Sequence, residues 1–172
     1  TCQWIREIQE EILEELRDDT PEEAVRRCIS MFRNRIGKLR NGKVPLSKLI
    51  VSRRVRRRVG EHRVMNLTAS ALLRGESIGQ SNPPGRKIRF VVVDRSRSIP
   101  QDRVRMGSEV ISRSPSITGQ RGEVQYYEAL ALRAASSLLS PFGLSEERLS
   151  RDGSVQTSLD DWTTPVKSLN LG

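Results

Sequence analysis

Two clusters of arginine are the part of this sequence whose residue types and spacing point most directly to a chemistry. One lies between residues 53 and 63, the other between 95 and 121, and they flank the strongly strand-forming segment 88–93. A guanidinium group matches phosphate oxygens in shape and stays charged at physiological pH. Aromatic residues, which would stack on bases, make up only 4% of the chain. The clusters therefore predict contacts to a nucleic-acid backbone without sequence preference.

The charge of the whole chain agrees with a polyanionic partner. Its 172 residues include 30 Lys and Arg against 21 Asp and Glu, a formal net charge of +9. Residues 1–24 are acidic, whereas residues 33–121 hold nearly all of the surplus arginine. This asymmetry predicts one surface for nucleic acid and another for protein or solvent, with the early glutamates interpreted as a solvated helix face.

Catalytic and metal-binding arrangements find little support in the residue inventory. The single histidine, His62, lies inside an arginine cluster, which argues against a Ser/His/acid site and against a zinc cluster. The segment 75–79 has the spacing of a nucleophile elbow, but no predicted strand precedes it. Cys2 and Cys28 lie near or on apolar helix stripes, as buried free thiols do. We therefore expect no catalytic residue and no metal site on this chain.

The elements that position the arginines are predicted to form a predominantly helical α+β fold. Apolar residues at helical spacing predict helices over 3–17, 21–40, 67–73 and 123–139. A capping box is predicted at Thr20 to Glu23, short strands at 49–51 and 88–93, and a turn-rich connection at 75–85. Residues 94–121 are expected to be one long loop. Between the first arginines, the valines at 55, 59 and 64 are expected to face inward and turn the arginines outward.

No apolar run approaches the roughly 20 residues that a bilayer span requires. No charged segment followed by an apolar one opens the chain, so no signal peptide is predicted and a cytoplasmic location is expected.

The order of these segments resembles the thumb region of archaeal family B DNA polymerases over most of residues 3–150. The matching pieces are residues 4–8, 44–51, 85–93, 102–103 and 124–127, the last leading into a helix that ends at 141–143. In that family the thumb is a largely helical lobe that grips primer–template duplex through backbone contacts. Where family members carry a Thr-Arg pair followed by a tyrosine, this chain has Arg56-Arg57 and His62.

The palm signatures of the family, including its metal-binding aspartates, are absent from this sequence. The resemblance therefore implies a separate large polymerase chain carrying palm, fingers and exonuclease, with a divalent metal, Mg²⁺, in that palm. The present chain would then be either a split-gene subunit or a fragment. The acidic first helices and the apolar side of the thumb are the expected docking surface for the large chain.

The residues expected to contact DNA come from both arginine clusters and from the strand between them. They are Arg53, Arg57, Arg86, Lys87, Arg89, Arg95, Arg97 and Arg103. The resemblance, as well as the charge, supports Lys87 and Arg103.

Near the C-terminus, Gln156, Leu159 and Trp162 have a spacing similar to that of a sliding-clamp-binding motif. The alternative interpretation is a passive tail. The predicted organisation is a helical hairpin at 1–43, a duplex-binding thumb at 44–150 and a flexible tail at 151–172.

The predicted function is the DNA-binding, non-catalytic part of a DNA-directed DNA polymerase, a nucleotidyltransferase of DNA replication. One alternative is a free-standing nucleic-acid-binding protein without sequence preference. A second is an interaction subunit whose arginines pair with an acidic protein surface.

Overall fold

The computed structural model describes residues 1–17 and 20–154 and separates the chain into two compact units. Unit 1 consists of Thr1–Trp4 and Gly42–Tyr127. Unit 2 consists of Ile5–Asn41 together with the described residues from Glu128 onward. Residues 128–150 thus group with the first helices, and not with residues 44–127 as the predicted organisation had it. Both arginine clusters lie in unit 1.

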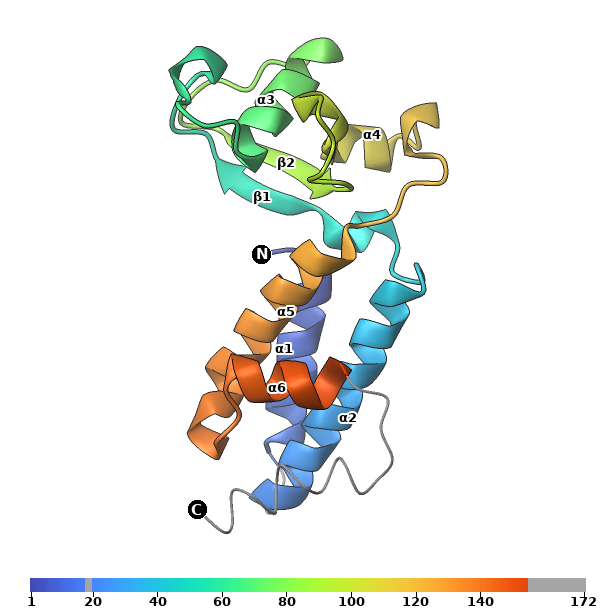
Figure 1. The fold of residues 1–172 in the computed structure, drawn as a ribbon, viewed down its shortest axis with the longest axis vertical. Helices are drawn as coiled ribbons and strands as arrows, with labels where there is room; N and C mark the ends of the chain where they lie inside the picture. The colour runs from blue at the N-terminus through green and yellow to red at the C-terminus, as the bar shows by residue number, and fades with distance from the viewer. Residues whose placement is uncertain (18–19, 155–172) are drawn as a thin grey trace. The chain divides into compact units, whose positions relative to one another are not determined.

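Unit 1 is built on a three-stranded antiparallel sheet with the order β1-β2-β3 (Figure 1). The strands are β1 (Val51–Arg54), β2 (Lys87–Val92) and β3 (Val104–Met106). Helix α3 (Leu67–Ser77) lies over one face of this sheet, and the short helix α4 (Gly107–Ile111) follows β3 directly. Short 3₁₀ turns occupy Leu46–Leu49, Val59–Glu61, Pro100–Asp102 and Pro115–Ile117.

Alternation along the strands decides which side chains form the core of unit 1. Val51 lies opposite Phe90, which lies opposite Met106 on the other side, and all three are buried. Side chains of paired residues point to the same face of a sheet. The core under α3 is therefore apolar, and the residues that alternate with it in β1 and the first half of β2 point away from it.

The hydroxyl group of Tyr127 links the end of β2 to the 3₁₀ turn just before β1. It donates a hydrogen bond to the carbonyl oxygen of Leu49 at 2.7 Å and accepts one from the amide of Val92 at 3.0 Å. The ring is fully buried, and this burial raises the pKa of Tyr127 well above its ordinary value. The tyrosine thereby satisfies two backbone groups that no longer pair with each other and fixes the first turn of α5 (Val124–Leu139) against the sheet.

A buried ion pair joins α3 to the β3–α4 connection. Arg74 donates from Nε and Nη2 to the two carboxylate oxygens of Glu109, at 3.1 and 2.6 Å. Glu109 also accepts hydrogen bonds from the amide of Met106 and the hydroxyl of Ser116, and its side chain is only 6% exposed. Every oxygen of the carboxylate therefore has a partner, as a buried charge requires.

Unit 2 contains most of α1 (Gln3–Glu15), α2 (Pro21–Arg40), most of α5, and α6 (Glu146–Ser154), with a 3₁₀ turn at Ser140–Phe142 between the last two. Helix α6 crosses against α2 (Figure 1). Buried apolar side chains from all four helices form the core. They include Ile8, Ile12, Cys28, Phe32, Ala131, Leu139 and Leu149.

The glutamates of α1 are not the solvated charge run that we expected, because three of them pair with arginines of α2. Arg35 contacts both Glu7, at 3.1 Å, and Glu11, and Arg27 contacts Glu15 at 2.6 Å. Part of the acidic surface expected to dock the large chain is therefore engaged within unit 2.

Several element boundaries differ from the prediction, each for a local reason. The strand predicted at 49–51 begins at Val51, because residues 46–49 form a 3₁₀ turn that Tyr127 anchors. Helix α3 continues to Ser77, four residues past the predicted end and into the expected turn-rich connection. Residues 94–121 are not one loop but contain β3 and α4. Helix α6 reaches Ser154, so the predicted tail does not start at 151.

Two finer expectations also fail. The Thr20 hydroxyl contacts the carboxylate of Glu23 at 3.2 Å and caps no backbone amide, so the reciprocal capping box does not form. Of the three valines among the first arginines, only Val55 is fully buried, and Val64 is 73% exposed, because residues 55–66 form bends and one 3₁₀ turn and not an α-helix.

The predominantly helical α+β class is confirmed. Within the residues that the structure describes, no helix combines the length and the apolar character needed to span a bilayer.

Candidate nucleic-acid interface

Strand register gathers three basic side chains on the side of the sheet away from its core. Arg54 lies opposite Lys87, and Ser52 lies opposite Arg89. Lys87 and Arg89 alternate with the buried Ile88 and Phe90, so they and Arg54 point to the other face and are exposed. We call Arg54, Lys87 and Arg89 the basic sheet face.

A second group of cations surrounds Tyr126, the first residue of the tyrosine pair. Nη2 of Arg53 donates to the Tyr126 hydroxyl at 3.2 Å, and the guanidinium carbon of Arg95 lies 5.5 Å from the centre of the ring. Arg95 is held in place by Glu123, which accepts from its backbone amide and its Nε, both at 2.6 Å. The Tyr126 ring meets Tyr127 edge to face, with centres 5.0 Å apart. We call Arg53, Arg95 and Tyr126 the Tyr126 cluster.

The electrostatics of the Tyr126 cluster keep its hydroxyl protonated. Partial burial raises the pKa of Tyr126, although Arg53 and Arg95 favour the ionised form. The ring therefore stays neutral and can support Arg95 through a cation–π contact, which contributes about 0.5–1 kcal/mol at an exposed site. The two guanidinium groups are fixed on a rigid platform, yet each keeps donors free for an external acceptor.

Arg103 and Arg97 have a different setting from the cations described above. Arg103 donates to the carbonyl oxygens of Arg97, at 2.8 Å, and Met65, at 3.3 Å. It therefore joins the loop after β2 to the segment before α3. Arg97 pairs with Asp94 at 3.2 Å and is 65% exposed.

The remaining predicted contact residues lie at the far end of the β1–β2 ladder. The carbonyl oxygen of Arg86 accepts from the amide of Val55 at 2.8 Å, which extends the pairing by one step beyond Arg54. Arg86 and Arg57 are both exposed there. The eight predicted residues thus form separate groups and not one patch. Gln156, Leu159 and Trp162 lie outside the described residues.

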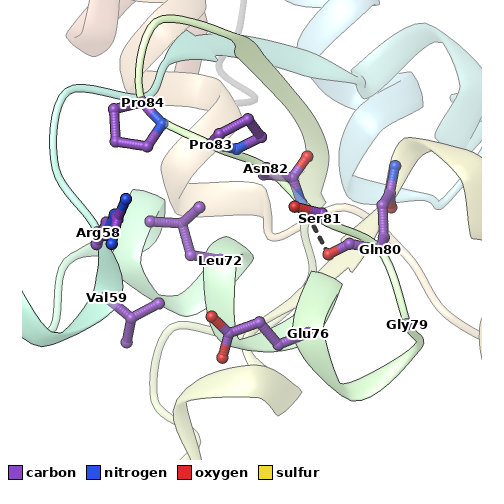
Figure 2. Close-up of a pocket in the computed structure, with 10 residues that line it drawn as sticks. All are labelled: Arg58, Val59, Leu72, Glu76, Gly79, Gln80, Ser81, Asn82, Pro83 and Pro84. Atoms are coloured by element: carbon purple, nitrogen blue, oxygen red, sulfur yellow. Dashed lines mark hydrogen bonds between the residues drawn. The ribbon is translucent and has the colours of Figure 1, made fainter.

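A hollow of about 470 Å³ borders α3 and the connection that follows it (Figure 2). Arg58, Val59, Leu72, Glu76 and the segment 79–84 line it. Glu76 is the only acidic residue among these, so the hollow lacks the carboxylate pair of a two-metal site. In the part of the chain that the structure describes, no group of three His, Cys, Asp or Glu residues could hold a metal ion.

The nucleophile-elbow spacing at 75–79 has no matching geometry. Gly75, Glu76 and Ser77 belong to the end of α3, and no strand leads into them. The Ser77 hydroxyl donates to the carbonyl oxygen of Arg74 at 2.7 Å. Ser77 is therefore an ordinary helix-end serine.

Two residues of the interface were missed from the sequence. Arg54 was one arginine in a run, and only the register with Lys87 shows that it shares a face with the predicted contacts. Tyr126 belongs to a motif that was noted, but its contacts to residues 53 and 95 arise from tertiary structure. The strand alternation around Ile88 could have grouped Lys87 with Arg89, but no sequence signal identifies their partners on β1.

Comparison with known proteins gives the class to which this fold belongs. A family B DNA polymerase from the hyperthermophilic archaeon Pyrobaculum calidifontis has a similar fold over 84% of this chain, with a TM-score of 0.65 and 20% sequence identity. The match covers 18% of that polymerase. The fold is therefore one that forms part of a family B DNA polymerase.

The relatives found by sequence are also DNA polymerases. A DNA polymerase of Thermococcus litoralis is 27% identical over 158 residues, which cover 91% of this chain and 9% of the relative. DNA polymerase 2 of Aeropyrum pernix is 30% identical over 142 residues, which cover 80% of this chain and 16% of the relative. No family model matches the chain. The predicted relationship to archaeal family B DNA polymerases is thus confirmed, and the chain corresponds in length to a small part of each of these enzymes.

Proposed function

We propose that this chain is the thumb portion of a family B DNA polymerase and grips primer–template duplex through phosphate contacts. The observation that supports this function best is the basic sheet face next to the Tyr126 cluster, on a fold shared with a family B DNA polymerase. The basic sheet face supplies exposed cations from two paired strands. The Tyr126 cluster supplies two arginines that contact the side chain of Tyr126. Exposed cations of this kind suit contacts to phosphate oxygens, which position a duplex without reading its sequence.

The edge position of β1 explains how both groups could serve one duplex. Successive residues of a strand point to opposite faces, so Arg53 and Arg54 leave β1 on different sides. In the described sheet β1 is an edge strand, which pairs only with β2. Long arginine side chains from both faces of an edge strand can extend toward the same phosphate backbone.

The chemistry of nucleotide transfer is assigned to a partner. Among the described residues no group of three His, Cys, Asp or Glu side chains could hold a metal ion, and we assign metal binding to a palm on another chain. A large chain with palm, fingers and exonuclease would hold Mg²⁺, and this chain would complete that enzyme by positioning the duplex.

The salt dependence of duplex binding tests the proposal on the full chain. If about five phosphates are neutralised, the logarithm of the association constant should fall with the logarithm of salt concentration with a slope of roughly −4 to −5. Fluorescence anisotropy with a labelled duplex of random sequence measures this slope. Two different duplex sequences should give the same affinity. A slope near zero, or a strong preference for one sequence, would contradict a phosphate grip.

A further inference from the structure

A second hollow in unit 1 contains arginines that belong neither to the basic sheet face nor to the Tyr126 cluster. It has a volume of about 630 Å³ and lies between the loop after β2, the start of β3 and the segment before α5. Arg97, Arg105 and Arg121 line it together with Asp94, Asp102 and Glu123. The three positive and three negative formal charges cancel. Whether the hollow attracts an anion therefore depends on which of these side chains already have ion-pair partners.

The three carboxylates of the hollow are all engaged by other groups. Asp94 pairs with Arg97 at 3.2 Å and accepts two hydrogen bonds from Ser96. Glu123 holds Arg95 at 2.6 Å, and Asp102 lies 4.0 Å from Arg74. Each of these carboxylates therefore already faces an arginine other than Arg105 and Arg121.

Arg105 and Arg121 are the cations left without a matching anion. Arg105 donates only to backbone carbonyl oxygens, those of Ser116 at 3.2 Å, Asp102 at 3.2 Å and Val104 at 2.8 Å. Among the described residues, neither Arg105 nor Arg121 has a carboxylate within ion-pair distance. Both guanidinium groups therefore lack a direct ion-pair partner among the described residues.

Arg105 is held in place, and the side chain of Arg121 lies close to the backbone of another segment. Three carbonyl oxygens fix the guanidinium of Arg105. Arg121 packs against the backbone of Gly42, so closely that a Cβ at that glycine would lie 2.6 Å from its guanidinium carbon. Gly42 has a φ of +67°, a conformation that favours glycine for a second reason. Because its guanidinium is fixed, Arg105 loses little side-chain freedom when it binds a ligand.

The surroundings of Arg105 work against its charge. Burial lowers the pKa of Arg105, and the neighbouring guanidinium groups of Arg74 and Arg97 lower it further, while Glu109 and Asp102 oppose this shift. A bound oxyanion would offset both the desolvation of the cation and the repulsion from its neighbours, because a nearby negative charge stabilises the charged guanidinium.

We propose that this hollow is a binding site for a phosphate oxyanion, held between Arg105 and Arg121. Arginine forks match phosphate oxygens in pairs, and Arg97 is placed to contribute when its ion pair with Asp94 opens. The phosphate belongs either to a nucleic-acid backbone or to free inorganic phosphate. The site itself is independent of the proposed function; only the first of these sources depends on it.

Arginine side-chain NMR on the full chain tests the site. Sodium phosphate is titrated against sodium chloride at equal ionic strength, and the Nε–H signals of Arg105 and Arg121 are followed. We expect a saturable shift of both signals. Arg121→Gln should weaken phosphate binding about tenfold, because it removes a charge-assisted contact, and Arg121→Lys should weaken it less. Arg6→Gln, at an exposed position on α1, removes the same charge and should leave the affinity unchanged.

Arg121→Gln is the decisive variant, because Arg105→Gln would also remove three hydrogen bonds that support the fold. A duplex without terminal phosphates identifies the source of the anion. If it shifts the same two signals, the hollow takes a backbone phosphate, and if only inorganic phosphate does, it takes the free ion. If neither ligand shifts them, the proposed site is wrong. In that case, unchanged binding of the duplex would still support the proposed contacts between DNA and the basic sheet face.

Discussion

Replacing Arg54, Lys87 and Arg89 with glutamine in one variant should weaken duplex binding about a hundredfold at physiological salt. The three side chains project from the same face of β1 and β2, so they are expected to contact neighbouring phosphates. Each lost contact should cost about 1 kcal/mol and remove about 0.9 from the magnitude of the salt slope. The slope should therefore change from roughly −4 to −5 to about −2. Anisotropy titrations over a range of salt concentrations measure both quantities.

A variant with the same loss of charge elsewhere separates local contacts from net charge. Arg6, Arg26 and Arg133 are exposed on helices of unit 2, and their replacement by glutamine also removes three positive charges. We expect this variant to bind duplex within about threefold of the parent chain, because long-range attraction is screened beyond about 8 Å at physiological salt. Equal losses in the two variants would mean that the basic sheet face is not the interface.

Glu109→Gln should lower the free energy of unfolding by about 3 kcal/mol. The substitution keeps the shape of the side chain but leaves the guanidinium of Arg74, whose side chain is 13% exposed, without its carboxylate. An unpaired charge in such a place is much more costly than the intact pair is stabilising. Urea denaturation followed by circular dichroism measures the change. Asp102→Asn is the control, because Asp102 faces the same arginine at 4.0 Å and is 43% exposed, and it should cost less than about 1 kcal/mol.

The same carboxylate predicts a dependence of stability on pH. Burial by itself would raise the pKa of Glu109, but hydrogen bonds from Arg74, from the amide of Met106 and from Ser116 hold it below the ordinary value. A group with a depressed folded-state pKa stabilises the fold above its unfolded pKa, about 4.3, and loses that contribution as the pH falls through the folded value. The parent chain should lose stability in this acid range, and Glu109→Gln should show a smaller loss. Equal pH profiles would contradict the ion pair.

The helices and the central strand were predictable because their apolar residues repeat over many positions. Ile8, Ile12, Cys28 and Phe32 follow helical spacing and are buried as expected, and the run around Phe90 forms the middle strand. By contrast, β3 and α4 contain three and five residues, too few to show a period. Tertiary contacts determine these two elements: β3 pairs with β2, and the buried carboxylate of Glu109 in α4 binds Arg74.

The arrangement of the basic side chains was only partly predictable. Charge indicated the segments that carry them, but strand register decides that Lys87 and Arg89 share a face with Arg54. The Tyr126 cluster joins residues 53, 95 and 126, whose proximity no local pattern encodes. The helical ion pairs of Glu7 and Glu15 were missed for the same reason, since their partners lie on another helix.

Primer extension tests the central claim most directly, with the candidate large polymerase chain assayed with and without this polypeptide at several salt concentrations. A thumb subunit should raise the extent of extension and shift its loss to higher salt, and the variant lacking Arg54, Lys87 and Arg89 should do so less. Extension that stays unchanged, while this chain alone still binds duplex DNA, would contradict the account and favour a free-standing nucleic-acid-binding protein.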